Sequence, residues 1–187
     1  MHWIDPESLN ESTHRVRQFL LNERGDVNGF VSTHGVQVHL PPHLGEALTA
    51  SVSAGDLTYV RGVRPRGADV LAALAIDTMR GDRIEDTGPP SKRPYGKGLP
   101  SHKHEMEGIC ERVLFGPHGE PNGVLFANGF IARFDPEVAQ DLDEFLKPGA
   151  AVMVSGNLRT TRWGSVLDAE YFWQAEEAAD EAHTDDK

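Results

Sequence analysis

The sequence predicts a mostly β protein made of two small five-stranded barrels in tandem, each with one helix between its third and fourth strands. The first observation is an internal repeat: residues 13–77 align without a gap on residues 107–171, 94 positions later. The second is the placement of glycine, which recurs where the strand pattern needs a turn or a bend. The paired glycines are Gly25/Gly119, Gly29/Gly123, Gly35/Gly129, Gly55/Gly149 and Gly62/Gly156.

The first half of each repeat predicts three strands. The first strand lies within residues 14–22 or 108–116 and ends at a glycine turn. The second and third strands flank a two-residue turn, His34-Gly35 in one copy and Asn128-Gly129 in the other. Asn-Gly is the strongest short hairpin signal, because both central residues of a type I′ turn need a positive φ.

The second half of each repeat predicts a helix and two further strands. In the second copy Asp135 is a suitable N-cap, Pro136 fits the first helical turn, and Pro148-Gly149 ends the helix. Its expected apolar face is Val138, Leu142, Phe145 and Leu146. The fourth strands follow at residues 57–63 and 151–157, and a loop with arginines leads to the fifth.

This order of elements resembles the OB-fold, a five-stranded Greek-key barrel. The chain is similar to tandem OB-fold proteins of bacteria, and the resemblance covers both copies. It implies a binding surface on strands 2 and 3 and on the adjoining loops, which OB-folds use for oligonucleotides or oligosaccharides. The expected organisation is an OB-fold-like repeat at 13–77, a flexible basic Pro/Gly linker at 78–106, a second repeat at 107–173 and an acidic tail at 174–187.

Composition restricts the class of protein. Of the 187 residues, 39% are hydrophobic and 25% are charged, which is typical of a soluble globular chain. No apolar run is long enough for a membrane helix, no signal peptide is evident, and Cys110 is the only cysteine. We therefore expect a cytoplasmic protein without disulfides or membrane contact. The net charge of −11 argues against strong non-specific binding to duplex nucleic acid.

Alternation along the strands, combined with two-residue turns, predicts which side chains face outward. An outward ring beside a cation suits single-stranded nucleic acid, because a base stacks on the ring while the cation contacts a phosphate. Arginines in the loops between strands 4 and 5, and one tryptophan, extend this surface. The predicted nucleic-acid contacts are Phe30, Gln37, His39, Arg64, Arg66, Phe126, Arg133, Arg159, Arg162 and Trp163.

A second interpretation is a protein-interaction or assembly module that binds no nucleic acid. The outward face predicted for the second copy includes Val124, Phe126 and Ile131, an apolar patch that soluble domains rarely leave bare. The two barrels would then pack on each other, or a homodimer would form through this face.

Metal and catalytic sites are not predicted. His39 and His43 flank a strand end, but the second copy has Arg133 and Glu137 at the matching positions, and His34 lies too far along the strand to join them. His102 and His104 fall in the expected linker. Cys110 has no fixed histidine partner, and phosphate-loop and hydrolase motifs are absent. We expect no enzymatic activity, no metal and no cofactor.

Overall fold

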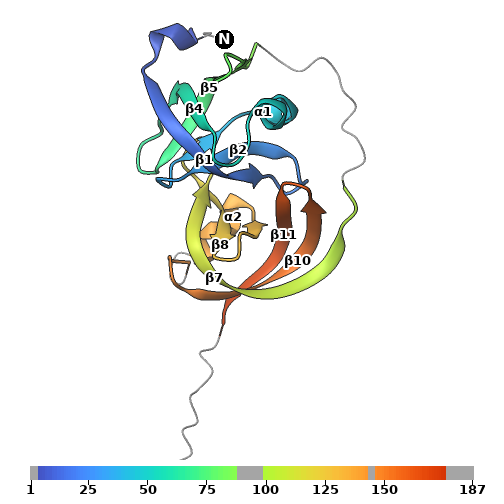
Figure 1. Ribbon diagram of the computed structural model, residues 1–187. Coiled ribbons are helices and arrows are strands. Elements are labelled where there is room, and N and C mark those ends of the chain that lie inside the picture. Colours follow the sequence, from blue (N-terminus) through green and yellow to red (C-terminus); the bar gives the residue numbers. More distant parts are fainter. Residues whose placement is uncertain (1–3, 88–98, 143–145, 176–187) are drawn as a thin grey trace, which may run out of the picture.

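The computed structural model describes residues 4–87, 99–142 and 146–175, and it contains two closed five-stranded barrels (Figure 1). The predicted mostly β class is therefore confirmed. Each barrel has one α-helix between its third and fourth strands, in the position that the sequence predicts. In the described part of the chain, neither helix has the length and apolar content needed to span a bilayer.

The first barrel is closed by a parallel pairing between its third and fifth strands. A short sixth strand pairs with the fifth outside this ring. Its elements are η1 (Pro6–Ser8), β1 (Glu11–Leu21), β2 (Val27–Ser32), β3 (Gln37–His39), η2 (Pro42–Leu44), α1 (Gly45–Ser51), β4 (Leu57–Val63), β5 (Val70–Thr78) and β6 (Arg83–Glu85).

The second barrel has the same order and is closed by the equivalent parallel pairing. Its elements are β7 (His102–Phe115), β8 (Pro121–Phe126), β9 (Ile131–Arg133), α2 (Pro136–Leu142), β10 (Ala151–Thr161) and β11 (Gly164–Gln174). Helix α2 begins at Pro136 as predicted, and it buries Ala139 and Leu142. Val138 was expected on the buried face but is exposed, and Phe145 lies outside the described residues.

The hairpins between the second and third strands differ from the predicted two-residue turns. In both copies the loop has three residues, and Gly35 and Gly129 each adopt a φ of 87°. A type I turn followed by a glycine in the left-handed region is the usual three-residue hairpin. The extra residue shifts the pairing by one, so Phe30 pairs with Val38 and Val124 pairs with Ala132. A shift of one residue moves side chains to the opposite face of a strand.

The two copies also differ in length between their last two strands. Val38 pairs with Leu71 in the first barrel, whereas its counterpart Ala132 pairs with Leu167 in the second. The segment that runs from the fourth strand to the fifth is therefore two residues longer in the second barrel than in the first. The constant offset of 94 between equivalent residues holds only through the fourth strand. The predicted equivalence of Ala75 with Ala169 is wrong for this reason.

Strands occupy both ends of the segment that we expected to be a linker. Strand β6 pairs with β5, and residues from His102 onward belong to β7 and pair with β10. Residues 88–98 lie outside the described part, as do residues 176–187 of the expected acidic tail. His102 and His104 thus lie on a strand, with ring centroids 6.0 Å apart.

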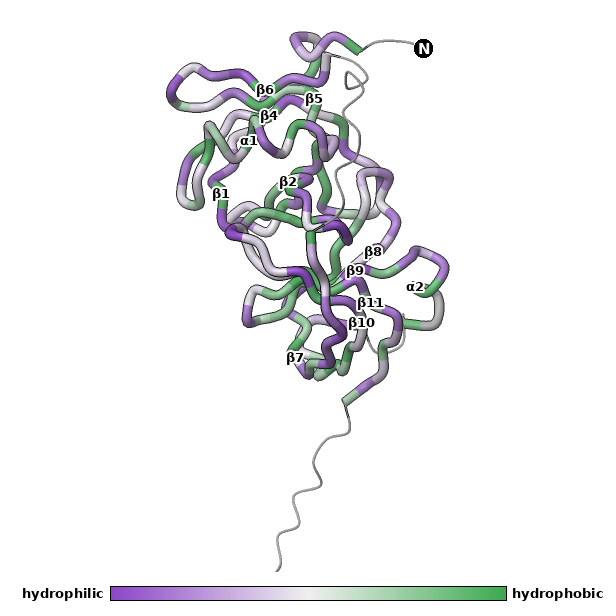
Figure 2. Tube along the Cα trace, turned by 90° about the vertical axis from the view of Figure 1, so that its right-hand side faces the viewer, coloured by the Kyte–Doolittle hydropathy of each residue, from purple (hydrophilic) through white to green (hydrophobic). Residues whose placement is uncertain are grey.

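The barrels share a continuous apolar core. Buried residues of the first barrel form one cluster with Leu114, Leu125, Ile131 and Val166 of the second. A second cluster, which includes Cys110, Val124 and Phe126, fills the interior of the second barrel. In Figure 2 the two barrels lie one above the other, and hydrophobic and hydrophilic residues alternate along their strands. The apolar contact between the barrels positions every surface considered below.

Candidate functional site

The strand faces predicted to bind nucleic acid are packed against each other. Gln37 is only 2% exposed, because it lies between the barrels. Its Nε2 donates to the carbonyl of Val113 at 3.0 Å, and its Oε1 accepts from the backbone N–H of Phe115 at 2.9 Å. Leu125 and Ile131 of the opposing strands are also buried. The face expected to meet a second chain is thus covered within this one.

Contacts across this interface are reciprocal. Gln18 Nε2 donates to the carbonyl of Gly129 at 2.7 Å, and Arg112, the counterpart of Gln18, lies against Gly35, the counterpart of Gly129. Arg17 Nη2 bonds to Glu111 Oε2 at 2.7 Å, and these two residues are themselves 94 positions apart. Reciprocal contacts of this kind characterise an interface with an approximate two-fold axis.

His39 and Arg133, also 94 positions apart, face outward from their barrels as predicted but are buried in the interface, each 4% exposed. Arg133 Nε donates to the carbonyl of Leu21 at 2.8 Å. His39 interacts with the backbone of Phe115, the counterpart of Leu21. Burial and the nearby Arg133 charge lower the pKa of His39 to about 4, so its ring is neutral at pH 7. Both side chains connect the barrels.

Phe30 and Phe126 were predicted to face outward, and this is wrong. Both are fully buried, because the three-residue hairpins turn them toward the barrel interiors. Val124 is buried in the second barrel for the same reason. The two aromatic platforms expected on the strand faces therefore do not exist.

The loop between β4 and β5 keeps two arginines at the surface. Arg66 is exposed, and Arg64 lies 3.5 Å from Asp69 with about half of its side chain exposed. The loop rests against the β7–β8 turn, where Gly119 lies close to Pro65. The two cations are accessible at one end of the interface.

The β10–β11 hairpin reaches from the second barrel to the first (Figure 1). Arg159 is partly buried there and donates through Nη1 to the carbonyl of Glu23 at 3.0 Å. The Trp163 ring packs edge-on against Phe19, with centroids 5.3 Å apart. Arg162 is exposed, and its guanidinium carbon lies 4.5 Å from the centre of the Trp163 ring. Arg162 and Trp163 thus form a cation–aromatic pair at the hairpin tip.

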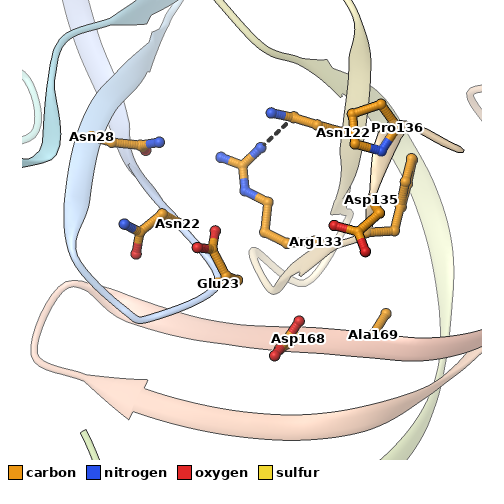
Figure 3. A pocket seen from close by; sticks show the side chains of 10 residues that line it. Asn22, Glu23, Asn28, Asn122, Arg133, Asp135, Pro136, Asp168 and Ala169 are labelled. Atoms are coloured by element: carbon orange, nitrogen blue, oxygen red, sulfur yellow. Dashed lines mark hydrogen bonds between the residues drawn. The ribbon is translucent and has the colours of Figure 1, made fainter. Parts of the chain in front are cut away.

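A pocket of about 250 Å³ opens beside Arg133 where the barrels meet (Figure 3). Arg133 projects into the middle of this view, with Asn122 and Asn28 on either side of its guanidinium. Nη1 donates to Asn122 Oδ1 at 2.7 Å, whereas Nη2 and Asn28 Oδ1 are buried and have no hydrogen-bond partner among the described residues. The pocket is lined by Asn22, Glu23, Asn28, Asn122, Arg133, Phe134, Asp135, Pro136, Asp168 and Ala169.

The charges of this pocket do not suit a phosphate. Glu23, Asp135 and Asp168 contribute three carboxylates against the single Arg133 cation. Burial lowers the pKa of Arg133 to about 10 and raises the pKa of Asp168. A nucleic-acid backbone entering here would meet a net negative charge, so the pocket does not extend the loop surface.

The histidines near the end of β3 are separated by the fold. His34 and His43 are exposed, and His43 lies 3.4 Å from Asp86, whereas His39 is buried between the barrels. Over the described ranges, three or more His, Cys, Asp or Glu side chains never gather in a metal-binding arrangement. Cys110 is buried, and burial raises its thiol pKa to about 11.

One surface was not predicted from the sequence, namely the outer face of β7, β10 and β11. Tyr171 and Trp173 are exposed there, and Ile109 and Met153 lie on the same face. The signal was present, because residues 171 and 173 are aromatic and two apart, and alternate residues of a strand share a face.

Comparisons with known proteins are sparse. Scans against protein-family models and against curated proteins find no match. Among solved structures, the chain is similar to a deletion mutant of the single-stranded DNA binding protein from Thermus aquaticus. The two are 18% identical, the match covers 89% of this chain and 92% of that one, and the TM-score is 0.29. A similarity this low carries no weight for function, which we infer from the geometry of this chain.

Proposed function

We propose that this chain is a non-enzymatic tandem OB-fold protein that binds single-stranded nucleic acid through its β4–β5 and β10–β11 loops. The observation that carries the proposal is the Arg162–Trp163 pair at the tip of the β10–β11 hairpin. The plane of an arginine stacks on unpaired bases, and its charge attracts phosphates. Loops in this position are also part of the surface that OB-folds use for oligonucleotides.

The proposed contact set is smaller than the one predicted from the sequence. Arg64, Arg66, Arg162 and the partly buried Trp163 remain in it, with Arg159 supporting the hairpin. Phe30, Gln37, His39, Phe126 and Arg133 do not, because the barrels bury them. With few cations and a net charge of −11, binding should be weak and should fall steeply with salt.

Fluorescence anisotropy with labelled oligothymidylate and oligouridylate at two salt concentrations tests the proposal. Arg162→Ala and Arg66→Ala should each weaken binding about 3- to 10-fold and reduce the salt dependence by about one phosphate contact. Arg80→Ala is the matched control, because Arg80 is exposed in the turn between β5 and β6, away from both loops. Equal effects of all three variants, or no binding at low salt, would contradict the proposal.

A protein-interaction module without nucleic-acid binding is the second candidate. It is favoured by the burial of both strand faces between the barrels, since this removes the surface on which most OB-fold contacts to a polymer are made. Absence of oligonucleotide binding at low salt would support this candidate.

A further inference from the structure

The outer face of the second barrel carries an aromatic and apolar surface bordered by carboxylates. We define the outer face as Ile109, Met153, Tyr171 and Trp173, with Glu105 and Glu107 at its border. Ile109 is 46% exposed, Tyr171 67% and Trp173 40%, although each belongs to a regular strand. In Figure 1 strands β7, β10 and β11 run side by side around the lower barrel.

The strand register places these side chains, apart from Ile109, in two rows. One row crosses the sheet from Glu107 on β7 through Met153 on β10 to Trp173 on β11. The next row runs from Glu105 through Ser155 to Tyr171. Because neighbouring strands are about 4.8 Å apart, the backbone position of each glutamate lies about 10 Å from that of the aromatic residue in its row.

The opposite side of the same strands is buried, which fixes the orientation of the rows. Val152 and Val154, which alternate with Met153, are fully buried in the barrel. Phe172, between the two exposed rings, packs edge-on against Phe134, with centroids 5.2 Å apart. The exposed rings are therefore not core residues displaced from the interior, and no other residue in the described ranges covers them.

We propose that the outer face binds a basic polypeptide segment, in which some arginine or lysine side chains lie against the two rings and others pair with Glu105 and Glu107. Cation–aromatic contact and carboxylate pairing both select a positive side chain. The long apolar stem of such a side chain also matches the methionine between ring and carboxylate.

Charge around the outer face favours this occupant over nucleic acid. Residues 107–171, which include most of the second barrel, carry a net charge of −5. Lys103 lies beyond the two rows and is paired with Glu170. A phosphate backbone would be repelled here, whereas a cationic chain would be attracted. This inference is independent of the nucleic-acid surface proposed for the loops.

The test uses the full chain and a fluorescein-labelled peptide of alternating arginine and glycine, followed by anisotropy. Trp173→Ala and the pair Glu105→Gln/Glu107→Gln should each weaken binding about tenfold. The matched charge control is Asp82→Asn/Glu137→Gln, which removes two exposed carboxylates elsewhere and should leave affinity within about twofold. Circular dichroism establishes that each variant is folded, and Tyr171→Ala provides a second ring variant if Trp173→Ala unfolds.

The outcomes are distinct. Loss of peptide binding in the outer-face variants but not in the control supports the proposal. Weaker binding of a peptide in which lysine replaces arginine also supports it. Equal loss with the Asp82→Asn/Glu137→Gln control would show attraction to overall charge and overturn it. Loss of oligothymidylate binding in Trp173→Ala would assign the face to nucleic acid and also overturn it. Failure of Arg162→Ala to affect oligonucleotide binding bears only on the loops.

Discussion

His39 shows how a single position couples the packing of the barrels to pH. The folded protein lowers its pKa from 6.5 to about 4, mainly because the ring is removed from water and also because Arg133 is close. The unfolded chain therefore binds more protons between these two values, and the free energy of unfolding falls as the pH drops through them. Stability associated with His39 is fully present above pH 6.5 and lost by about pH 4.

We predict that the free energy of unfolding decreases by about 2 kcal/mol between pH 7 and pH 5 because of His39. Urea unfolding followed by circular dichroism at the two pH values measures this change. His39→Gln should remove most of it. His118→Gln is the control, because the side chain of His118 is 91% exposed. A pH dependence unchanged in His39→Gln would contradict the burial argument.

The effect will not disappear completely in the His39→Gln variant. His14 is also buried, and its pKa is lowered by burial and by Arg64. It contributes in the same direction as His39, because its pKa too is lower in the folded state than its ordinary value. Comparing His14→Gln with His39→Gln separates the two contributions.

At the scale of elements, a bulge fixes the fourth and fifth strands of each barrel in register. The pairing shifts at Gly62 in the first barrel and at its counterpart Gly156 in the second. A Cβ on Gly156 would lie 2.1 Å from the carbonyl oxygen of Asp168, so no side chain fits without moving the backbone. The same crowding exists at Gly62, where the distance to the Ala72 carbonyl is 2.3 Å.

We predict that Gly156→Ala destabilises the protein by about 2–3 kcal/mol, because the clash involves backbone and cannot be relieved by a rotamer change. Gly81→Ala is the control: it lies in a turn with a φ of 87° and open space around the added carbon, so its cost should be about 1 kcal/mol. Thermal unfolding of both variants tests the order. A smaller loss for Gly156→Ala would show that the bulge relaxes.

Most elements follow from the sequence, because glycine spacing and strand alternation are local signals. The order of the five barrel strands in each copy and the helix start at Pro136 are present as predicted, whereas β6 and the parallel closure of each barrel were not predicted. Which side chains point into the barrel was harder to predict. The loop at Gly35 can hold two or three residues, and the loop length decides whether Phe30 points outward or into the barrel. The burial of His39 and Arg133 could not be predicted locally, since it depends on how two barrels pack.

At the scale of the whole molecule, the two barrels share an apolar core. Leu125 and Ile131 of the second barrel are part of the core cluster of the first, and Trp163 packs on Phe19. Neither barrel completes its buried surface without the other.

We predict a single calorimetric unfolding transition, with the van't Hoff enthalpy equal to the calorimetric enthalpy. Leu125→Ser, which places a hydroxyl in the shared core without changing either turn, should separate the transition into two or lower its cooperativity. Val63→Ser, an exposed strand position, is the control. Two transitions in the unmodified protein would contradict the prediction.

The reciprocal contacts across the interface have one more consequence. In a dimer of two identical subunits, every mutation at a two-fold contact would appear on both sides of the axis. Joined in one polypeptide, the halves are free to diverge, and they have done so: glutamine occupies one side at Gln18 and arginine the other at Arg112. One side of the axis also holds a neutral imidazole and the other a guanidinium. Covalent linkage thus permits an asymmetry that a homodimer of one gene product cannot reach.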